Sequence, residues 1–146
     1  LGFLPGKEQE KLDPYFKPIR EVLISYYNGA GTVKDMLKNE VIEITALAYL
    51  RGRTFYNSFV LLDEAQNVTA EQMKLFLTRI GLYSKIVVNG DLEQKDIYGV
   101  SGLETAIAKL KPIIESTNSS SMGKVEFSKE DSVRSPLVKQ ILRYWD

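Results

Sequence analysis

Two adjacent carboxylates directly follow a short apolar run near the middle of the chain. The apolar residues at 59–62 precede Asp63 and Glu64, and such a run suits a buried parallel strand that ends at the acids. The pattern is typical of a Walker B motif. Asp63 would hold the Mg²⁺ of a nucleotide, usually through water, and Glu64 would polarise the attacking water. The alternative is an acidic strand end beside a helix N-terminus, where the helix dipole favours acids.

A second apolar run, at 85–88, also ends in polar residues. It is followed by Asn89, Gly90 and Asp91, and then by Gln94. In a nucleotide site, Asp91 and Gln94 would sense the γ-phosphate or orient water. The alternative is an ordinary Asn-Gly-Asp turn, which is common after a strand. Neighbouring parallel strands end side by side, so the two strand ends together favour a shared site.

Several arginines could bind phosphate, because the guanidinium group pairs with it in a bidentate manner. Arg51 and Arg53 flank a glycine and precede Thr54. Arg79 lies near the end of an expected helix, and Arg134 lies just before the last one. Taken singly, each could equally be a surface or structural arginine.

The composition limits the chemistry that these residues can support. The 146 residues include 19 basic and 19 acidic side chains, no Cys and no His. Thiolate zinc sites, disulfides, a cysteine nucleophile and a Ser-His-Asp triad are therefore excluded. A zero net charge argues against a strongly basic nucleic-acid binder but leaves room for a local basic patch. No apolar run is long enough to span a bilayer and no signal segment opens the chain, so we expect a cytoplasmic protein without membrane partners.

The elements expected to position these residues alternate between helix and strand. We expect a helix that starts at Asp13-Pro14 and stops at Asn28-Gly29, then a short helix near 33–37. Strands are expected at 41–44, 58–62, 85–88 and 124–127. Capping boxes at Thr69/Gln72 and Ser101/Glu104 start further helices, the first of which ends at Gly81, and Ser135-Pro136 starts a last one. This order predicts an α/β fold with a mostly parallel sheet, in which ligands bind at the carboxyl ends of the strands.

The phosphate-cradling string G-x-x-x-x-G-K-[ST] is not found in this sequence. Two glycine-lysine stretches, at 29–34 and 6–7, are the nearest matches. Neither has the required spacing. The sequence as written therefore cannot build a complete P-loop.

Several ordered strings resemble the PhoH family, also known as the phosphate-starvation-inducible ATPases. They cover nearly the whole chain: 1–6, 51–54, 63–67, 72–74, 77–81, 90–96, 101–103 and 131–138. Two positions depart from the family pattern. Asn89 stands where the family more often has Thr, and residues 97–99 replace a usual Leu-Pro.

The resemblance implies a RecA-like P-loop NTPase core, similar to that of superfamily 1 helicases, with ATP and Mg²⁺ as cofactors. It also implies that an N-terminal strand and the Walker A loop lie upstream of Leu1, so residues 1–146 would be the larger, C-terminal part of the domain. By motif, Asp63 and Glu64 are Walker B and Gln94 is a phosphate-sensing residue. Arg134 would act near the nucleotide.

The resemblance further implies a homo-oligomeric ring, a hexamer, in which Arg79, Arg51 or Arg53 could reach a neighbouring subunit's nucleotide. RNA or single-stranded nucleic acid would be the coupled partner. Two other functions stay open. The chain could be a non-catalytic module for assembly or nucleic-acid binding, or a metal-dependent hydrolase built on Asp63, Glu64 and Asp91.

Overall fold

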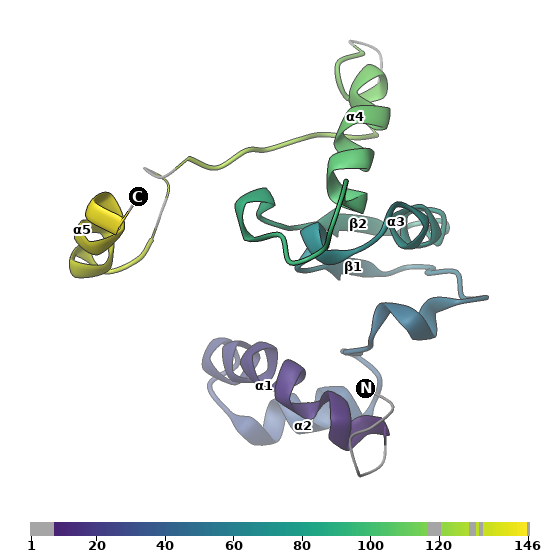
Figure 1. Ribbon diagram of the computed structural model, residues 1–146. Coiled ribbons are helices and arrows are strands. Elements are labelled where there is room, and N and C mark those ends of the chain that lie inside the picture. The colour runs from purple at the N-terminus through teal and green to yellow at the C-terminus, as the bar shows by residue number, and fades with distance from the viewer. Residues whose placement is uncertain (1–7, 117–120, 129–130, 132, 146) are drawn as a thin grey trace.

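A parallel two-stranded sheet lies at the centre of the computed structural model, which describes residues 8–116, 121–128, 131 and 133–145 (Figure 1). Strand β1 (Phe59–Leu62) pairs with β2 (Lys85–Val88), and the register joins Phe59 to Lys85 and Leu62 to Val88. Both strands appear where the apolar runs predicted them, β1 one residue later than expected. The α/β class with a parallel sheet flanked by helices is confirmed.

Helices α3 (Ala70–Leu77) and α4 (Gly102–Ile114) pack on each other beside this sheet, together with the short 3₁₀ helix η2 (Ala65–Asn67). The core at this junction is formed by Ala65, Met73 and Leu103. Gly102 permits the close approach of α4, because a Cβ there would lie 2.5 Å from the carbonyl oxygen of Thr69. This packing fixes the segments that leave β1 and β2.

Both predicted capping boxes are present. The Thr69 side chain accepts from the backbone N–H of Gln72, and the Gln72 side chain accepts from that of Thr69. Ser101 and Glu104 are paired in the same way at the start of α4. Helix α3 ends four residues before Gly81, because Thr78 already caps it with N–H bonds to two carbonyls of the last turn.

The N-terminal helices form a separate hairpin. Helix α1 (Glu8–Tyr26) packs against α2 (Ala30–Lys38), and the 3₁₀ helix η1 (Leu47–Leu50) follows. The predicted stop at Asn28-Gly29 is confirmed, with Asn28 in the left-handed region at φ 53°. The predicted start at Asp13 is wrong, since residues 8–12 are mostly strong helix formers that extend the helix upstream.

Two of the four expected strands do not form. At 41–44, the backbone N–H groups of Val41 and Ile42 bond the carbonyl oxygen of Met36, so this stretch closes the end of α2 instead of pairing with a strand. At 124–127, Val125 and Phe127 are exposed and the segment pairs with no strand among the described residues. Alternating β-branched and apolar residues suit a strand, but a strand also needs a partner for its backbone hydrogen bonds.

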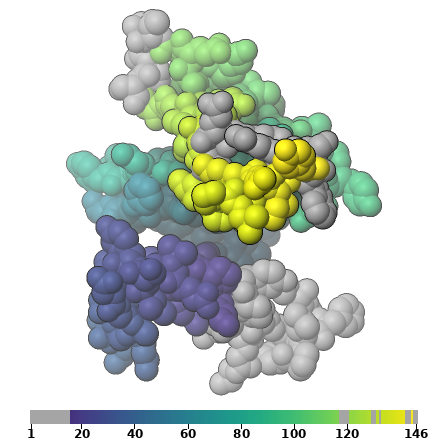
Figure 2. All heavy atoms as spheres, turned by 90° about the vertical axis from the view of Figure 1, so that its left-hand side faces the viewer, coloured from purple at the N-terminus to yellow at the C-terminus, as the bar shows by residue number. Residues whose placement is uncertain are grey.

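Helix α5 (Pro136–Trp145) begins at the predicted Pro136 and lies apart from the sheet in Figure 1. Figure 2, seen from that side, shows its yellow atoms in front of the green and teal atoms of the central unit. Within the described part of the chain, no helix is both long and apolar enough to cross a membrane.

Candidate functional site

Polar side chains gather where β1 and β2 end, at a surface that we call the carboxyl edge (residues 63–67 and 89–94). The two strand ends are tied together by their backbones: the N–H of Asn89 donates to Leu62 O (2.8 Å) and the N–H of Ala65 donates to Asn89 O (3.0 Å). The Asn89 side chain continues this pairing, since its Nδ2 donates to Oδ1 of Asp63 at 2.7 Å. The first acid therefore lies directly beside the end of the second strand.

Glu64 has an unusual backbone for a residue with a long side chain. Its φ of 53° lies in the left-handed region, where it caps η2. Such a conformation costs on the order of 1–3 kcal/mol for a non-glycine residue and is common at functional sites. The turn follows β1, which ends at Leu62 before both acids, and it holds the Glu64 carboxylate within 2.6 Å of the Gln66 amide nitrogen.

Gln66 connects the two polar strand ends and was not singled out as a site residue from the sequence. It is 1% exposed, its Nε2 donates to Oε2 of Glu64, and its Oε1 accepts from the N–H of Asp91 at 3.0 Å. Gly90 leaves room for it, because a Cβ there would lie 2.7 Å from that same Oε1. The available signal was a Gln two residues after the acidic pair and a Gly in the facing turn.

Asp91 and Gln94, the two candidate residues that follow β2, contact each other on the facing loop. Gln94 Nε2 donates to Oδ2 of Asp91 at 2.7 Å, and Oδ1 of Asp91 accepts from the N–H of Glu93 at the start of the 3₁₀ helix η3 (Leu92–Gln94). Asp91 thus shapes the turn through both of its oxygens. The turn interpretation and the site interpretation are compatible here, because this cap places Gln94 beside Asp91.

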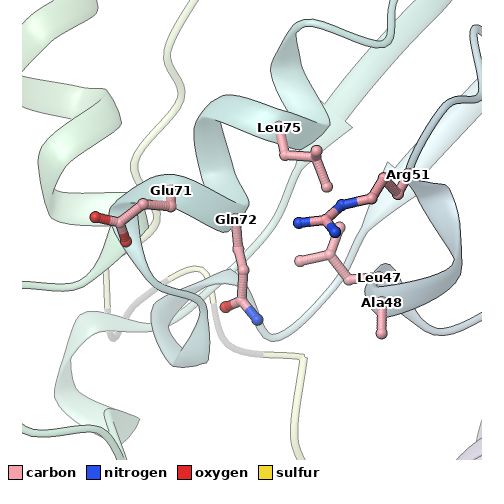
Figure 3. Close-up of a pocket in the computed structure, with 6 residues that line it drawn as sticks. All are labelled: Leu47, Ala48, Arg51, Glu71, Gln72 and Leu75. Carbon is pink, nitrogen blue, oxygen red and sulfur yellow. The ribbon is translucent and has the colours of Figure 1, made fainter.

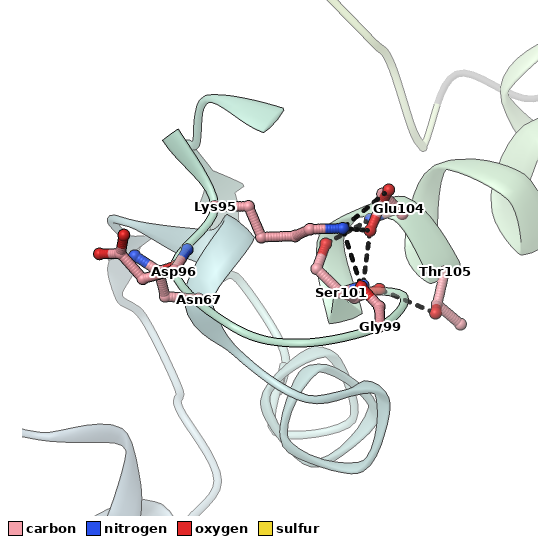
Figure 4. A network of polar contacts seen from close by, with 7 residues as sticks. All are labelled: Asn67, Lys95, Asp96, Gly99, Ser101, Glu104 and Thr105. Atoms are coloured by element: carbon pink, nitrogen blue, oxygen red, sulfur yellow. Dashed lines mark hydrogen bonds and ion pairs between the residues drawn. The ribbon is translucent and has the colours of Figure 1, made fainter. Parts of the chain in front are cut away.

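The loop that follows is anchored to α4 and η2 (Figure 4). Asn67 Oδ1 accepts from the N–H of Asp96 at 2.8 Å, and Lys95 Nζ donates to Gly99 O (2.8 Å) and to Glu104 (3.1 Å). The backbone N–H of Ser101, and then Lys95, hold the pKa of the Glu104 carboxyl below its usual value. These bonds fix the loop despite its departure from the family pattern at 97–99.

Two of the four predicted arginines, Arg53 and Arg79, lie at the opposite end of the sheet. Arg53 makes two hydrogen bonds to Glu43, at 2.5 and 2.7 Å, which lower the pKa of that carboxyl and raise the pKa of the guanidinium. Arg79 donates to the carbonyl oxygens of Leu75 and Arg53. Thr54, which directly follows Arg53, is exposed. The structure does not bring these residues to the acids of the carboxyl edge.

Arg51 lines a shallow hollow of about 320 Å³ between η1 and α3 (Figure 3). In the close-up its guanidinium group lies over Leu47 and points toward α3. The other lining residues are Ala48, Glu71, Gln72 and Leu75. Arg134 precedes α5 and is exposed, and α5 lies apart from the sheet in Figure 1.

The carboxyl edge suits Mg²⁺ bound together with a phosphate better than a metal enclosed by protein. Among the described residues no cluster of three acids could enclose a metal. Asp63 is exposed, and within that same part of the chain its Oδ2 carries no hydrogen bond. Mg²⁺ keeps several waters and takes one or two carboxylates plus substrate phosphates. The donors present therefore fit a Mg²⁺–nucleotide.

The fold and this edge define an α/β protein whose polar residues end two parallel strands, and comparison with known proteins identifies the family. The family model described as "PhoH-like protein" matches residues 1–146. The chain therefore belongs to the PhoH family.

Individual relatives agree with that assignment. The chain is 42% identical to the PhoH-like protein of Bacillus subtilis (strain 168), over all of this chain and 44% of that protein. It is 47% identical to protein PhoH of Escherichia coli (strain K12), over 97% of this chain and 39% of that protein. The PhoH-like protein of Synechocystis is 39% identical, with 43% of its length covered. The chain thus spans less than half the length of these curated relatives.

Proposed function

We propose that this chain forms part of an ATP-hydrolysing site that uses Mg²⁺. The observation that carries the proposal is the joined carboxyl edge. The buried Gln66 links Glu64 to Asp91, which holds Gln94, and Asn89 at the end of the second strand bonds Asp63. Two carboxylates on a parallel strand end, backed by a second polar strand end, match the needs of phosphoryl transfer to water.

Each residue of the edge has a distinct role in this proposal. Asp63 would hold Mg²⁺ through water, and the ion would neutralise charge on the phosphates. Glu64 orients the attacking water and accepts its proton, and its contact with Gln66 fixes the direction of the carboxylate. Gln94, held by Asp91, would contact the γ-phosphate.

The four candidate arginines lie outside the carboxyl edge and have separate roles in this proposal. Arg134 would stabilise charge near the nucleotide once α5 approaches it, as an arginine does in related phosphoryl transfers. Arg51, Arg53 and Arg79 would serve a nucleotide held by a neighbouring copy in a ring. A ring, a cytoplasmic location and coupling to single-stranded nucleic acid are parts of the same proposal.

The test compares Glu64→Gln with Glu71→Gln in the longest protein that carries this sequence. Glu71 is exposed on α3 and lies outside the carboxyl edge, so it is a matched control. We expect Glu64→Gln to lower kcat by about 10²-fold or more while Mg²⁺–ATP still binds. Hydrolysis that survives this substitution contradicts the role of Glu64.

A non-catalytic module is the competing function, favoured by the lack of a P-loop string in these 146 residues. Titration calorimetry of the chain alone with Mg²⁺–ATP separates the two. Micromolar binding by the chain alone would show that the phosphate cradle is not needed. Hydrolysis that is absent from the longest protein would favour the module.

A further inference from the structure

Large side chains are exposed at the other end of the sheet, which we call the amino edge (residues 53–58 and 78–85). Tyr56 is 59% exposed and Tyr83 is 87% exposed. Ile80 and Leu82 beside them are also exposed. Tyr83 and Leu82 belong to the short connection between α3 and β2, and Tyr56 belongs to the connection between η1 and β1.

The two segments of the amino edge form one rigid platform. The N–H of Phe55 donates to Arg79 O, the N–H of Gly81 donates back to Phe55 O at 2.7 Å, and the N–H of Asn57 donates to Leu82 O at 3.1 Å. Exposed side chains on such a scaffold lose little freedom when they bind a partner.

Ser84 adds a side-chain bridge between the same two segments. Its hydroxyl accepts from the N–H of Ser58 and donates to the carbonyl oxygen of Phe55. The tyrosines are therefore carried by backbone that is tied at several points and not by a free loop.

The ring of Tyr56 is supported on one side by Gly81. A Cβ at Gly81 would lie 2.8 and 2.9 Å from the Cδ1 and Cε1 atoms of that ring, and 2.4 Å from Phe55 O. The glycine backbone thus lies against the ring edge, while more than half of the side chain remains open to solvent. This arrangement presents an aromatic surface in a defined orientation.

Two residues of the amino edge also have a strained backbone conformation. Tyr83 has a φ of 59° and Asn57 a φ of 50°, both in the left-handed region. For a bulky residue such as tyrosine this conformation is a genuine outlier. The Tyr83 ring is exposed and so gains little from packing. Strain that holds an exposed aromatic ring outward is an observation that points to recognition.

The charge of the amino edge is of one sign. Residues 53–58 and 78–85 contain Arg53, Arg79 and Lys85 and no Asp or Glu. Arg53 is paired with Glu43. The bonds of Arg79 go to carbonyl and hydroxyl oxygens, which do not neutralise its charge, and Lys85 is exposed. A net positive surface in a chain of zero net charge favours an anionic partner.

We propose that the amino edge binds single-stranded nucleic acid, with bases stacked on Tyr56 and Tyr83 and phosphates beside Arg79 and Lys85. Aromatic platforms combined with cations are the chemistry by which proteins hold unpaired strands without reading their sequence. The inference deepens the proposed function, on which it rests for its partner. It places that partner at the end of the sheet opposite to the nucleotide.

A second copy of the chain fits this edge less well. A two-fold contact of the edge with itself would place Arg79 and Lys85 against the same cations of the other copy, which is repulsive. Stacking and phosphate contacts do not involve the 2′-hydroxyl, so RNA and DNA should bind alike. Duplexes should bind weakly, since their bases are already stacked.

The test measures fluorescence anisotropy of labelled oligouridylate, oligothymidylate and a duplex with the longest protein that carries this sequence. We expect Tyr56→Ala/Tyr83→Ala to weaken binding of both single strands at least tenfold. The double change to Phe retains stacking and should bind as the wild type does. Tyr98→Ala is the matched control, because Tyr98 is fully exposed on the loop after the carboxyl edge.

Cation variants test the phosphate contacts separately. Arg79→Gln/Lys85→Gln should reduce the slope of log K against log salt by about one to two units. Unchanged binding in the alanine pair overturns the proposal, as does an altered oligomeric state, which would assign the edge to contacts between copies. Basal ATP hydrolysis should be unaffected in the tyrosine variants, which leave every residue of the proposed hydrolysis site in place, so a failure here is distinguishable from a failure of the proposed hydrolysis.

Discussion

The two ends of the small parallel sheet differ in chemistry although they are only four residue pairs apart. The carboxyl edge is acidic and amide-rich, and its side chains bond one another across the two strands. The amino edge is basic and aromatic. Backbone hydrogen bonds and the Ser84 hydroxyl join its two segments, while Tyr56 and Tyr83 are exposed. A side chain held by neighbours suits chemistry that needs fixed geometry, whereas an open ring suits binding of a variable partner.

The largest expected effect is a loss of ATP hydrolysis when the carboxyl edge is changed and the amino edge is left intact. Asp63→Asn in the longest protein that carries this sequence should lower ATP hydrolysis by about 10²-fold, because a carboxylate that holds Mg²⁺ contributes several kcal/mol to transition-state charge stabilisation. Raising the Mg²⁺ concentration should restore part of the rate. Single-strand binding at the amino edge should stay as in the wild type. A variant that loses both activities equally would show that the two ends are not independent.

The next effect concerns stability at the carboxyl edge. Gln66→Ala removes the buried amide that accepts from the Asp91 N–H, and leaves that backbone group unsatisfied. We expect the free energy of unfolding to fall by about 1–3 kcal/mol. Denaturant titration of the 146-residue chain measures it. Gln94→Ala is the control, since Gln94 is exposed and its loss should change stability by less than about 0.5 kcal/mol.

The Ser84 hydroxyl, which bridges the two segments of the amino edge, should contribute less to the free energy of unfolding than Gln66 does. Ser84→Ala removes one hydroxyl that bonds Ser58 N and Phe55 O, and the backbone bonds of Phe55, Asn57 and Gly81 remain. The expected loss is about 1 kcal/mol, measured by the same titration. A loss larger than that of Gln66→Ala would reverse the comparison and make the amino edge the more side-chain-dependent end.

The carboxyl edge was largely predictable from the sequence because apolar runs determine where parallel strands end. Asp63 and Glu64 lie at the end of β1, and Asp91 and Gln94 follow β2, as their positions predicted. Gln66 was not predictable as the connecting residue. Its role depends on the facing turn, where Gly90 leaves room for its amide, and a pattern along one strand does not contain that information.

Other elements were predicted wrongly for a related reason. The stretches at 41–44 and 124–127 have the composition of strands, yet neither has a partner strand among the described residues. The first instead caps α2 through Met36 O. Residues 1–6, one of the strings that resemble the PhoH family, lie outside the described residues. Local propensity thus identified helices and caps well and pairing partners poorly.

The smallest expected effect is acid sensitivity on the carboxyl side, since the amino edge contains no carboxylate. The pKa of Glu104 is lowered in the folded state, first by the Ser101 N–H and then by Lys95. Its contribution to stability is therefore present above the unfolded pKa of about 4.3 and is lost as the pH falls through the folded pKa. Glu104→Gln keeps the capping geometry and removes the charge.

Melting temperatures of the wild type and Glu104→Gln at pH 7 and pH 3 measure this contribution. The melting temperature of the wild type should fall more on acidification than that of Glu104→Gln. The other acids titrate in both proteins, so their effect cancels when the two changes in melting temperature are subtracted. Lys95→Met should retain most of the acid sensitivity, because the Ser101 N–H is the larger cause of the shift and remains in place. If Lys95→Met removes the sensitivity completely, the ion pair and not the helix cap holds the loop beside the carboxyl edge.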